Sequence, residues 1–254
     1  MNQYIAFKTL VKREVARVFR IWSQTLLPPI ITSFLYFIIF GHVIGSRIGD
    51  VEGMSYMEFI LPGLVFMPMV MAAYTNSSSS FFGAKFGRSI EELLVSPMSN
   101  ITIILGYVTG AVLRGVLIAI LVGIVGWFFT RTPMHSYLIV LLYAVIGSLL
   151  FGLAGLLNGI YAKTFDDISF LPTFVLTPLN YFGGVFYSVQ MLPGIWQHVA
   201  QVDPILYLMQ GFRYGFLGVS GQHIYMTTLI AVLLVVALFG FCLYLMRNGK
   251  GLRA

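Results

Sequence analysis

The chain has 254 residues, of which 58% are hydrophobic and 9% charged, and its mean hydropathy is +0.89. Soluble domains of this size carry about 25% charged residues, so the composition excludes an ordinary soluble enzyme and indicates a membrane protein. The single cysteine, Cys242, excludes an internal disulfide and a cysteine-based metal cluster. The net charge of +6 raises the question of nucleic-acid binding, which the positions of the charges answer below.

Long apolar stretches define the expected fold. A helix needs roughly 20 apolar residues to cross the hydrocarbon core of a membrane, which is about 30 Å thick. Six stretches meet that length, and their continuity favours helices over the alternating strands of a barrel. We therefore expect an all-α fold, with a single transmembrane domain over residues 1–254. The predicted spans cover residues 24–44, 59–80, 102–129, 137–161, 168–188 and 224–246.

Residues 1–23, ahead of the first span, have the pattern of an amphipathic helix. Apolar residues recur at spacings of three and four along one side, and basic residues occupy the rest. We expect this helix to lie in the cytoplasmic interface of the membrane, either as an anchor alone or as a docking surface as well. The apolar positions are Tyr4, Phe7, Val11, Val15, Val18 and Trp22, and the basic positions are Lys8, Lys12, Arg13, Arg17 and Arg20.

The distribution of Lys and Arg predicts the orientation of the chain. Six spans place both ends on one side of the membrane, and eleven of the 15 basic residues fall on that side. Because basic residues accumulate in cytoplasmic connections, both termini are expected in the cytoplasm, and the excess positive charge reflects topology rather than nucleic-acid binding. Besides the five basic residues of the first segment, the inner group comprises Lys85, Arg88, Lys163, Arg247, Lys250 and Arg253.

Residues 84–99, between the second and third spans, contain the sequence SIEELLVSPMS. Ser89 and Glu92 match a capping box, and the acidic residues suit the first turn of a helix, where the helix dipole favours negative charge. The following proline is expected to end the helix. The segment therefore predicts a short, rigid cytoplasmic helix that fits a groove on another protein. The residues expected at that contact are Ser89, Ile90, Glu91, Glu92, Leu93, Leu94 and Pro97.

Residues 189–223 are too apolar for a free loop and too interrupted to cross the membrane. Pro193 and Pro204 divide them into two pieces. Asp203 before Pro204 is typical of an N-cap followed by proline at the first helical position. We expect two short helices that enter the outer leaflet and return, packed against the bundle because backbone at that depth must be buried in protein.

Small residues four positions apart within the spans predict close packing between helices. This pattern is common in membrane bundles and indicates packing rather than a particular function. The pairs are Gly106 and Gly110, Gly155 and Gly159, and Ser148 and Gly152.

Arg114 lies near the middle of the third predicted span. A charge at that depth costs about 3 kcal/mol, so its side chain should face the bundle or a wet cavity. Two interpretations are open: a substrate or gating contact, or a structural pairing with a carbonyl or another helix. The polar run Thr75–Ser80 is open in the same way, because it either lines a path or forms a polar helix end.

Common catalytic motifs are missing from the sequence. No phosphate-binding loop of the form GxxxxGK[ST], no HExxH and no GxSxG occurs, so neither ATP hydrolysis nor a common hydrolase is expected in this chain. The four histidines lack metal-ligand spacing, so no metal site is expected. An ATP-independent secondary transporter is the alternative function. Such proteins usually carry several ionisable residues at the membrane midplane. In this sequence Arg114 is the only ionisable residue predicted near the midplane.

Three features together resemble the ABC type-2 permeases, the membrane subunits of bacterial ATP-driven exporters. They are the amphipathic N-terminal helix ahead of six spans, the EELLVSP helix, which is similar to the coupling helix of that family, and the stretch LTPLNYFGGVFYSVQMLPGIWQHVAQVDPILYLMQGFRYG at residues 176–215. Phe182 departs from the aliphatic or small residue that is commoner in the family. The matching positions are Gly183, Val185, Leu192, Pro193, Pro204, Ile205, Tyr207 and Arg213.

The resemblance implies a transport function in the bacterial inner membrane, surrounded by lipid. Two copies of the chain would form the substrate path, and a separate cytoplasmic ATPase would bind ATP and Mg²⁺, so that this chain itself needs no cofactor. ATP binding would move the coupling helix, and the region between the last two spans would guard the outer exit. The substrate class stays open. The candidate path or gating residues are Arg114, Gly183, Gly184, Pro193, Pro204, Tyr207 and Arg213.

Overall fold

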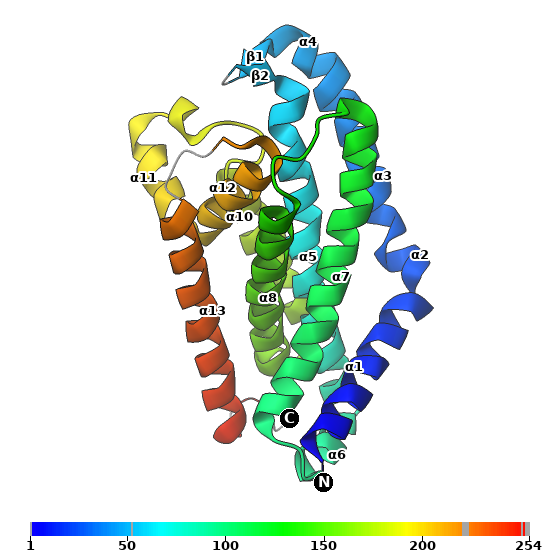
Figure 1. Ribbon diagram of the computed structural model, residues 1–254. Coiled ribbons are helices and arrows are strands. Elements are labelled where there is room, and N and C mark those ends of the chain that lie inside the picture. Colours follow the sequence, from blue (N-terminus) through cyan, green and yellow to red (C-terminus); the bar gives the residue numbers. More distant parts are fainter. Residues whose placement is uncertain (1, 52, 220–223, 250, 252–254) are drawn as a thin grey trace.

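The computed structural model describes residues 2–51, 53–219, 224–249 and 251. Two of the basic residues predicted in the cytoplasm, Lys250 and Arg253, lie outside the described residues. The same holds for residues 220–223, the end of the segment predicted between the last two spans. The described chain is a bundle of long helices, as the composition predicts (Figure 1). Five of its helical runs are long and apolar enough to cross a membrane: Trp22–Gly41, α5 (Tyr56–Phe86), α7 (Asn100–Thr130), α8 (Tyr137–Tyr161) and α13 (Ile224–Arg247).

Helix α5 forms the centre of the bundle and packs against both α7 and α8. Of its most apolar stretch 72% is buried, compared with 22% for α13 and for Trp22–Gly41. Its first turn is fixed by a capping box, in which Ser55 and Glu58 each accept a bond from the other's backbone N–H. The peripheral helices therefore keep apolar faces that are free for lipid or for another chain.

Glycine permits the close approach of α8 to α5. A Cβ atom at Gly155 would overlap the carbonyl oxygen of Tyr74, and one at Gly159 would lie 2.9 Å from the carbonyl oxygen of Ser78. The predicted packing role of this glycine pair is therefore confirmed. The pair packs α8 against α5 of the same chain.

The N-terminal part of the chain is a series of helical pieces followed by a small hairpin. Pro28 and Pro29 lie at the start of the third piece, where the missing backbone N–H has no intrahelical partner to lose. The two short antiparallel strands are a local departure from the predicted all-α fold. The elements are α1 (Gln3–Arg20), α2 (Trp22–Thr25), α3 (Leu27–Tyr36), the π-helical η1 (Phe37–Ile44), α4 (Gly45–Ile48), β1 (Asp50–Val51) and β2 (Met54–Ser55).

The predicted span 168–188 is a chain of short pieces rather than one long helix. Pro172 and Pro178 lack backbone donors, so the regular hydrogen-bond ladder is interrupted and part of the segment adopts wider π-helical turns. The helical run also ends at Phe182, earlier than predicted. Its pieces are α9 (Phe165–Leu171), η2 (Pro172–Leu176) and α10 (Thr177–Phe182).

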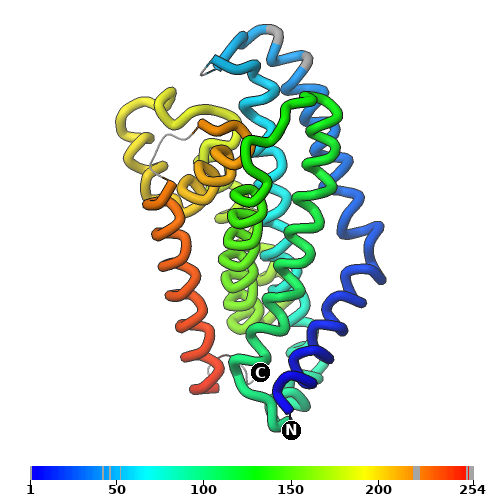
Figure 2. The backbone as a smooth tube through the Cα atoms, in the orientation of Figure 1, coloured from blue at the N-terminus to red at the C-terminus, as the bar shows by residue number. Residues whose placement is uncertain are grey.

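Two short helices follow, as predicted for the region between the last two spans. Asp203 caps the second of them by accepting a bond of 2.8 Å from the N–H of Ile205. These helices lie toward one end of the bundle, together with the strands, whereas the start of α1 and the end of α13 lie at the other (Figures 1 and 2). The elements are the 3₁₀ turn η3 (Val189–Met191), α11 (Gly194–Val202) and α12 (Pro204–Leu217).

Candidate functional site

Helix α6 (Ser89–Val95) lies at the end of the bundle where α1 begins (Figure 1). Ile90 is 2% exposed and packs in an apolar cluster with residues of α7, and Leu93 is partly buried against the same cluster. Leu94 is exposed, and Val95 is 86% exposed. The apolar residues expected at the contact therefore divide into a side that holds α6 on its own bundle and a side that is open.

The capping box predicted at Ser89 and Glu92 is wrong. The N-cap of α6 is Arg88, whose φ of 55° lies in the left-handed region, so Ser89 is already inside the helix. Its hydroxyl donates instead to the carbonyl oxygen of Ala84 at 3.2 Å. The two acidic residues still lie in the first turn, and the helix still ends before the proline, as predicted.

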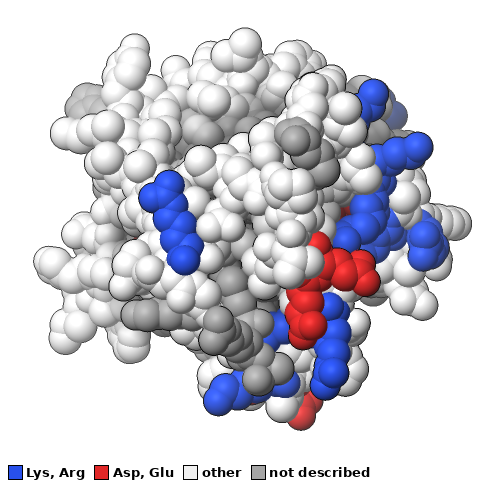
Figure 3. Space-filling view, turned by 90° about the horizontal axis from the view of Figure 1, so that it is seen from below, with Lys and Arg blue, Asp and Glu red and all other residues white. Residues whose placement is uncertain are grey.

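An aromatic cluster lies at the end of α5, just ahead of α6 in the sequence. Phe82, Phe86 and Phe165 form a cluster with ring centroids 5.0 to 6.0 Å apart, and Phe86 and Phe165 are more than half exposed. Because Phe165 begins α9, two connections at this end of the bundle share one surface. Figure 3, a view onto this end, shows Lys and Arg gathered over part of it, with a few acidic side chains among them.

Helix α1 docks on the bundle through a buried carboxylate. Glu14 is 1% exposed, and its Oε1 accepts a bond of 2.8 Å from the hydroxyl of Ser80 in α5. Its Oε2 lies 3.7 Å from a guanidinium nitrogen of Arg17. Burial raises the pKa of Glu14, and the bond from Ser80 and the charges of Arg17 and Arg13 oppose that rise.

Two arginines of α1 complete this network. Arg17 donates to the carbonyl of Asn76 at 3.2 Å and to the hydroxyl of Ser79 at 2.7 Å. Arg13 donates to the hydroxyl of Tyr107 in α7 at 2.8 Å. Ser79, Ser80 and the carbonyl of Asn76 therefore bind α1 inside the chain, so this part of the polar run is more than a polar helix end.

The face that α1 presents to the bundle differs from the predicted apolar face, on which Tyr4 and Trp22 are exposed. The prediction followed apolar residues alone and missed Glu14. The sequence does contain a sign that Glu14 is buried. It is the one acidic residue of this segment, and apolar residues lie four positions before and after it, on the same face of the helix. The buried residues of α1 are Ala6, Leu10, Glu14 and Val18.

Arg114 lines a groove of about 320 Å³ between α3, α5 and α7. Its Nε is buried without a hydrogen-bond partner, and neither ion pair found among the described residues involves it. The structural pairing considered above is therefore not observed in the described part of the chain. Among the described residues, Arg114 is the one charged residue that lines this groove.

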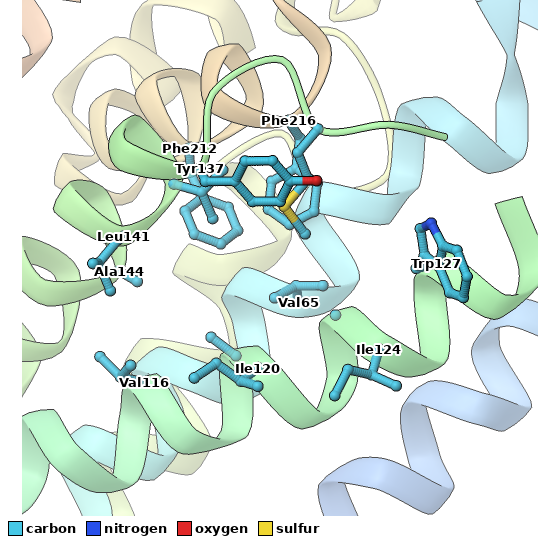
Figure 4. Close-up of a pocket in the computed structure, with 14 residues that line it drawn as sticks. Val65, Val116, Ile120, Ile124, Trp127, Tyr137, Leu141, Ala144, Phe212 and Phe216 are labelled. Atoms are coloured by element: carbon cyan, nitrogen blue, oxygen red, sulfur yellow. The ribbon is translucent and has the colours of Figure 1, made fainter. Parts of the chain in front are cut away.

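A second groove, of about 390 Å³, lies between α7 and α8 near α12 (Figure 4). Among the described residues, no charged side chain lines it. Figure 4 shows Trp127, Tyr137, Phe212 and Phe216 around it. Its wholly uncharged wall distinguishes it from the groove at Arg114.

The structure brings three of the other predicted path residues together. Gly183 and Gly184 form the turn after α10, and Arg213 of α12 donates a hydrogen bond to the carbonyl of Gly184. The Arg213 guanidinium also lies 4.3 Å from the ring centroid of Phe59 in α5. Pro204 begins the helix that carries Arg213. These contacts hold the turn against the central helix.

Pro193 and Tyr207 do not join that turn. Pro193 is exposed ahead of α11, and the hydroxyl of Tyr207 donates to the carbonyl of Gln201 at 2.6 Å, which ties α11 to α12. Within the described residues, no hydrogen bond, ion pair or groove joins these residues to Arg114. The predicted path residues therefore occupy several places.

Membrane-length helices, a docked N-terminal helix and a short helix between α5 and α7 together define a polytopic membrane permease. The family model for ABC-2 type transporters matches residues 5–217, and the chain belongs to that family. It is similar to the inner membrane transport permease YadH of Escherichia coli (strain K12), with 53% identity over 251 residues, covering 99% of this chain and 98% of that protein. Nodulation protein J of Rhizobium meliloti (strain 1021) is 24% identical over 208 residues, covering 80% of this chain and 79% of that protein.

Proposed function

We propose that the chain is the membrane subunit of an ATP-driven exporter, in which two copies form the substrate path and a separate cytoplasmic ATPase binds ATP and Mg²⁺. Membership of the ABC-2 type transporter family and full-length similarity to an inner membrane transport permease support transport across a bacterial inner membrane. The observation that carries the coupling to an ATPase is α6, which joins the central helix α5 to α7 and has one open side.

The proposed contact with the ATPase uses the open side of α6. Ile90 supports the helix from within, so the contact itself falls to Leu94, Val95 and the acidic first turn. Phe86 and Phe165 extend the surface with exposed aromatic area. Aromatic and aliphatic anchors ringed by charge are typical of protein interfaces.

The proposed orientation places the α6 end of the bundle in the cytoplasm. The start of α1 and the α5–α6 connection lie at that end (Figure 1), and they carry Lys8, Lys12, Lys85 and Arg88. The run of residues 165–182 leads from the α6 end toward the end that carries α12. As a helix it covers about 27 Å, close to the thickness of the hydrocarbon core. We count it as the sixth span, which puts both termini in the cytoplasm.

The proposed dimer surface lies on the peripheral helices. Gly155 and Gly159 already serve packing within the chain, so they do not supply it. The run Trp22–Gly41 and helix α13 have the largest exposed apolar share among the membrane-length helices of the described chain. Native mass spectrometry of the complex should give two permease chains and two ATPase chains.

Val95→Asp tests the coupling role of α6, because it adds a charge to the open side without disturbing the bundle. The ATPase is first identified by its co-purification with the unmodified chain. We expect the Val95→Asp protein to fold but no longer to co-purify with that ATPase. Val202→Asp, at an 84% exposed valine on α11, is the matched control and should keep the ATPase. Leu93→Asp is less clean, because Leu93 also packs on its own chain. Retention of the ATPase by Val95→Asp would contradict the proposed contact.

A further inference from the structure

The groove at Arg114 is open along one side of the bundle. Pro28 and Thr32 on its α3 wall are exposed. Its α5 wall runs from Leu64 to Thr75, which corresponds to about 16 Å along the helix axis. A molecule at membrane depth can therefore reach the groove from the side, without passing through the bundle.

Positive charge exceeds negative charge in this part of the molecule. Arg13 and Arg17 share the carboxylate of Glu14. Arg114 adds a third positive charge, and neither ion pair found among the described residues includes it. A guanidinium held away from water without a counter-charge is unfavourable, and an anion bound in the groove compensates it directly.

Arg114 is the cationic donor that the groove offers. Thr25 and Thr75 also line it, but their hydroxyls donate to the carbonyls of Ile21 and Met71, at 3.0 and 2.8 Å. Only their oxygen lone pairs remain, and these do not bind an anion. Much of the remaining wall consists of proline, methionine and leucine side chains. Neutral polar side chains, those of Gln24, Thr32, Ser33 and Tyr36, lie on the side of α2 and α3, whereas the α5 wall is mostly apolar. The groove thus combines one cationic point with an apolar wall along α5.

We propose that this groove binds an anionic amphiphile, whose acidic head pairs with Arg114 and whose apolar chain lies along α5. A phosphate or carboxylate head matches the fork of donors that a guanidinium presents. The inference rests on the proposed function in one respect, since the amphiphile is the class of substrate that the exporter carries. The head belongs either to a free amphiphile or to a bilayer lipid, and the test separates these two sources.

The test measures binding of radiolabelled dodecyl phosphate to the full chain in nanodiscs of phosphatidylcholine. Dodecyltrimethylammonium serves as the cationic counterpart, and inorganic phosphate as the head without a chain. We expect saturable binding of dodecyl phosphate and none of the other two. Arg114→Gln should weaken binding by about tenfold or more, and Arg114→Lys should keep most of it. Arg131→Gln, at the exposed arginine that ends α7, should leave it unchanged.

Thr32→Trp fills the groove while leaving Arg114 in place, so it decides the question if Arg114→Gln fails to fold. It should weaken dodecyl phosphate binding as well. A second arm adds phosphatidylglycerol to the nanodiscs: displacement of the probe assigns the groove to lipid headgroups, and no displacement assigns it to free amphiphiles. Equal binding of the anionic and cationic probes would overturn the proposal. Unchanged binding in Arg114→Gln, or in Thr32→Trp if Arg114→Gln does not fold, would overturn it as well.

No ATPase takes part in these measurements. A chain that binds dodecyl phosphate but has no ATPase partner would contradict the exporter and leave the anionic groove intact. A chain that couples to an ATPase through α6 but shows no Arg114-dependent binding would contradict the groove alone.

Discussion

The carboxylate of Glu14 in α1 accepts a hydrogen bond of 2.8 Å from the hydroxyl of Ser80 in α5, although the two residues are 66 positions apart. Arg13 and Arg17, beside it on the same helix, bond to α7 and α5 respectively. The N-terminal helix is therefore attached to the bundle through polar contacts. An amphipathic helix held only by lipid would have no reason to bury a carboxylate.

Glu14→Ala should loosen α1. It removes the bond from Ser80 and deprives Arg17 of its carboxylate, and breaking a buried ion pair in this way costs about 3 kcal/mol. Hydrogen–deuterium exchange should rise over residues 3–20 and stay unchanged in the centre of α5. Glu91→Ala, at an exposed acidic residue of α6, is the control and should leave the exchange of α1 as it is. Similar exchange of α1 in both variants would show that the network does not hold the helix.

Gly155→Ala should separate α8 from α5, because the added methyl group would overlap the backbone carbonyl of Tyr74, which cannot rotate away. Overpacking of this kind costs about 1–3 kcal/mol. Gly123→Ala in α7 is the matched control: a Cβ there meets no atom within 4 Å, and the exchange favours the helix by up to about 1 kcal/mol. Thermal unfolding in detergent should rank Gly155→Ala below the unmodified protein and Gly123→Ala at or above it. The reverse order would contradict the packing described for α5 and α8.

Asp203, which lies outside the five membrane-length runs, should make stability depend on pH. Burial raises the pKa of Asp203 from its ordinary value of 3.8 to about 6, against the opposing bond from the N–H of Ile205. The folded protein therefore holds this proton more tightly than the unfolded chain does, and the resulting stability is complete below pH 4 and is lost as the pH rises through 6. The unfolding temperature should fall between pH 4 and pH 6. Asp203→Asn keeps the cap without the charge and should flatten this change; parallel profiles would contradict it.

Single-cysteine labelling should report the orientation. Cys242 is the chain's one cysteine and is buried, so Cys242→Ser gives a clean background. In that background Val202→Cys should react with an impermeant maleimide on intact cells, and Lys12→Cys only after the membrane is opened. Both positions are exposed in the structure, so accessibility within the protein does not limit either reaction. The opposite pattern would invert the proposed topology.

Hydropathy predicted the membrane-length helices well because each of them is a long apolar run. The predicted span 137–161 matches α8, and α7 and α13 begin and end within a few residues of the predicted limits. The span predicted at 168–188 differed because hydropathy does not register the backbone donors that Pro172 and Pro178 lack. The sequence also does not reveal the left-handed turn at Arg88, which moved the start of α6.

The polar contacts could not be predicted in the same way. Glu14 lies among basic residues, and its burial depends on where α5 and α7 place Ser80 and Tyr107, far away in the sequence. Of the sites foreseen, Arg114 lines a groove, whereas Arg213 bonds to a backbone carbonyl. From the sequence alone, both residues are simply arginines within an apolar chain. The difference between their surroundings arises only from how the helices pack.

The network around Glu14 also constrains the order in which the chain assembles during synthesis. The partners of α1 on α5 and α7 are made 59 to 94 residues later than the arginines that bind them. Until then the partners of Glu14, Arg13 and Arg17 on α5 and α7 have not been made, and water or lipid headgroups solvate these three side chains. Helix α1 is therefore made well before its partners, and it can complete these contacts only once α7 has been inserted.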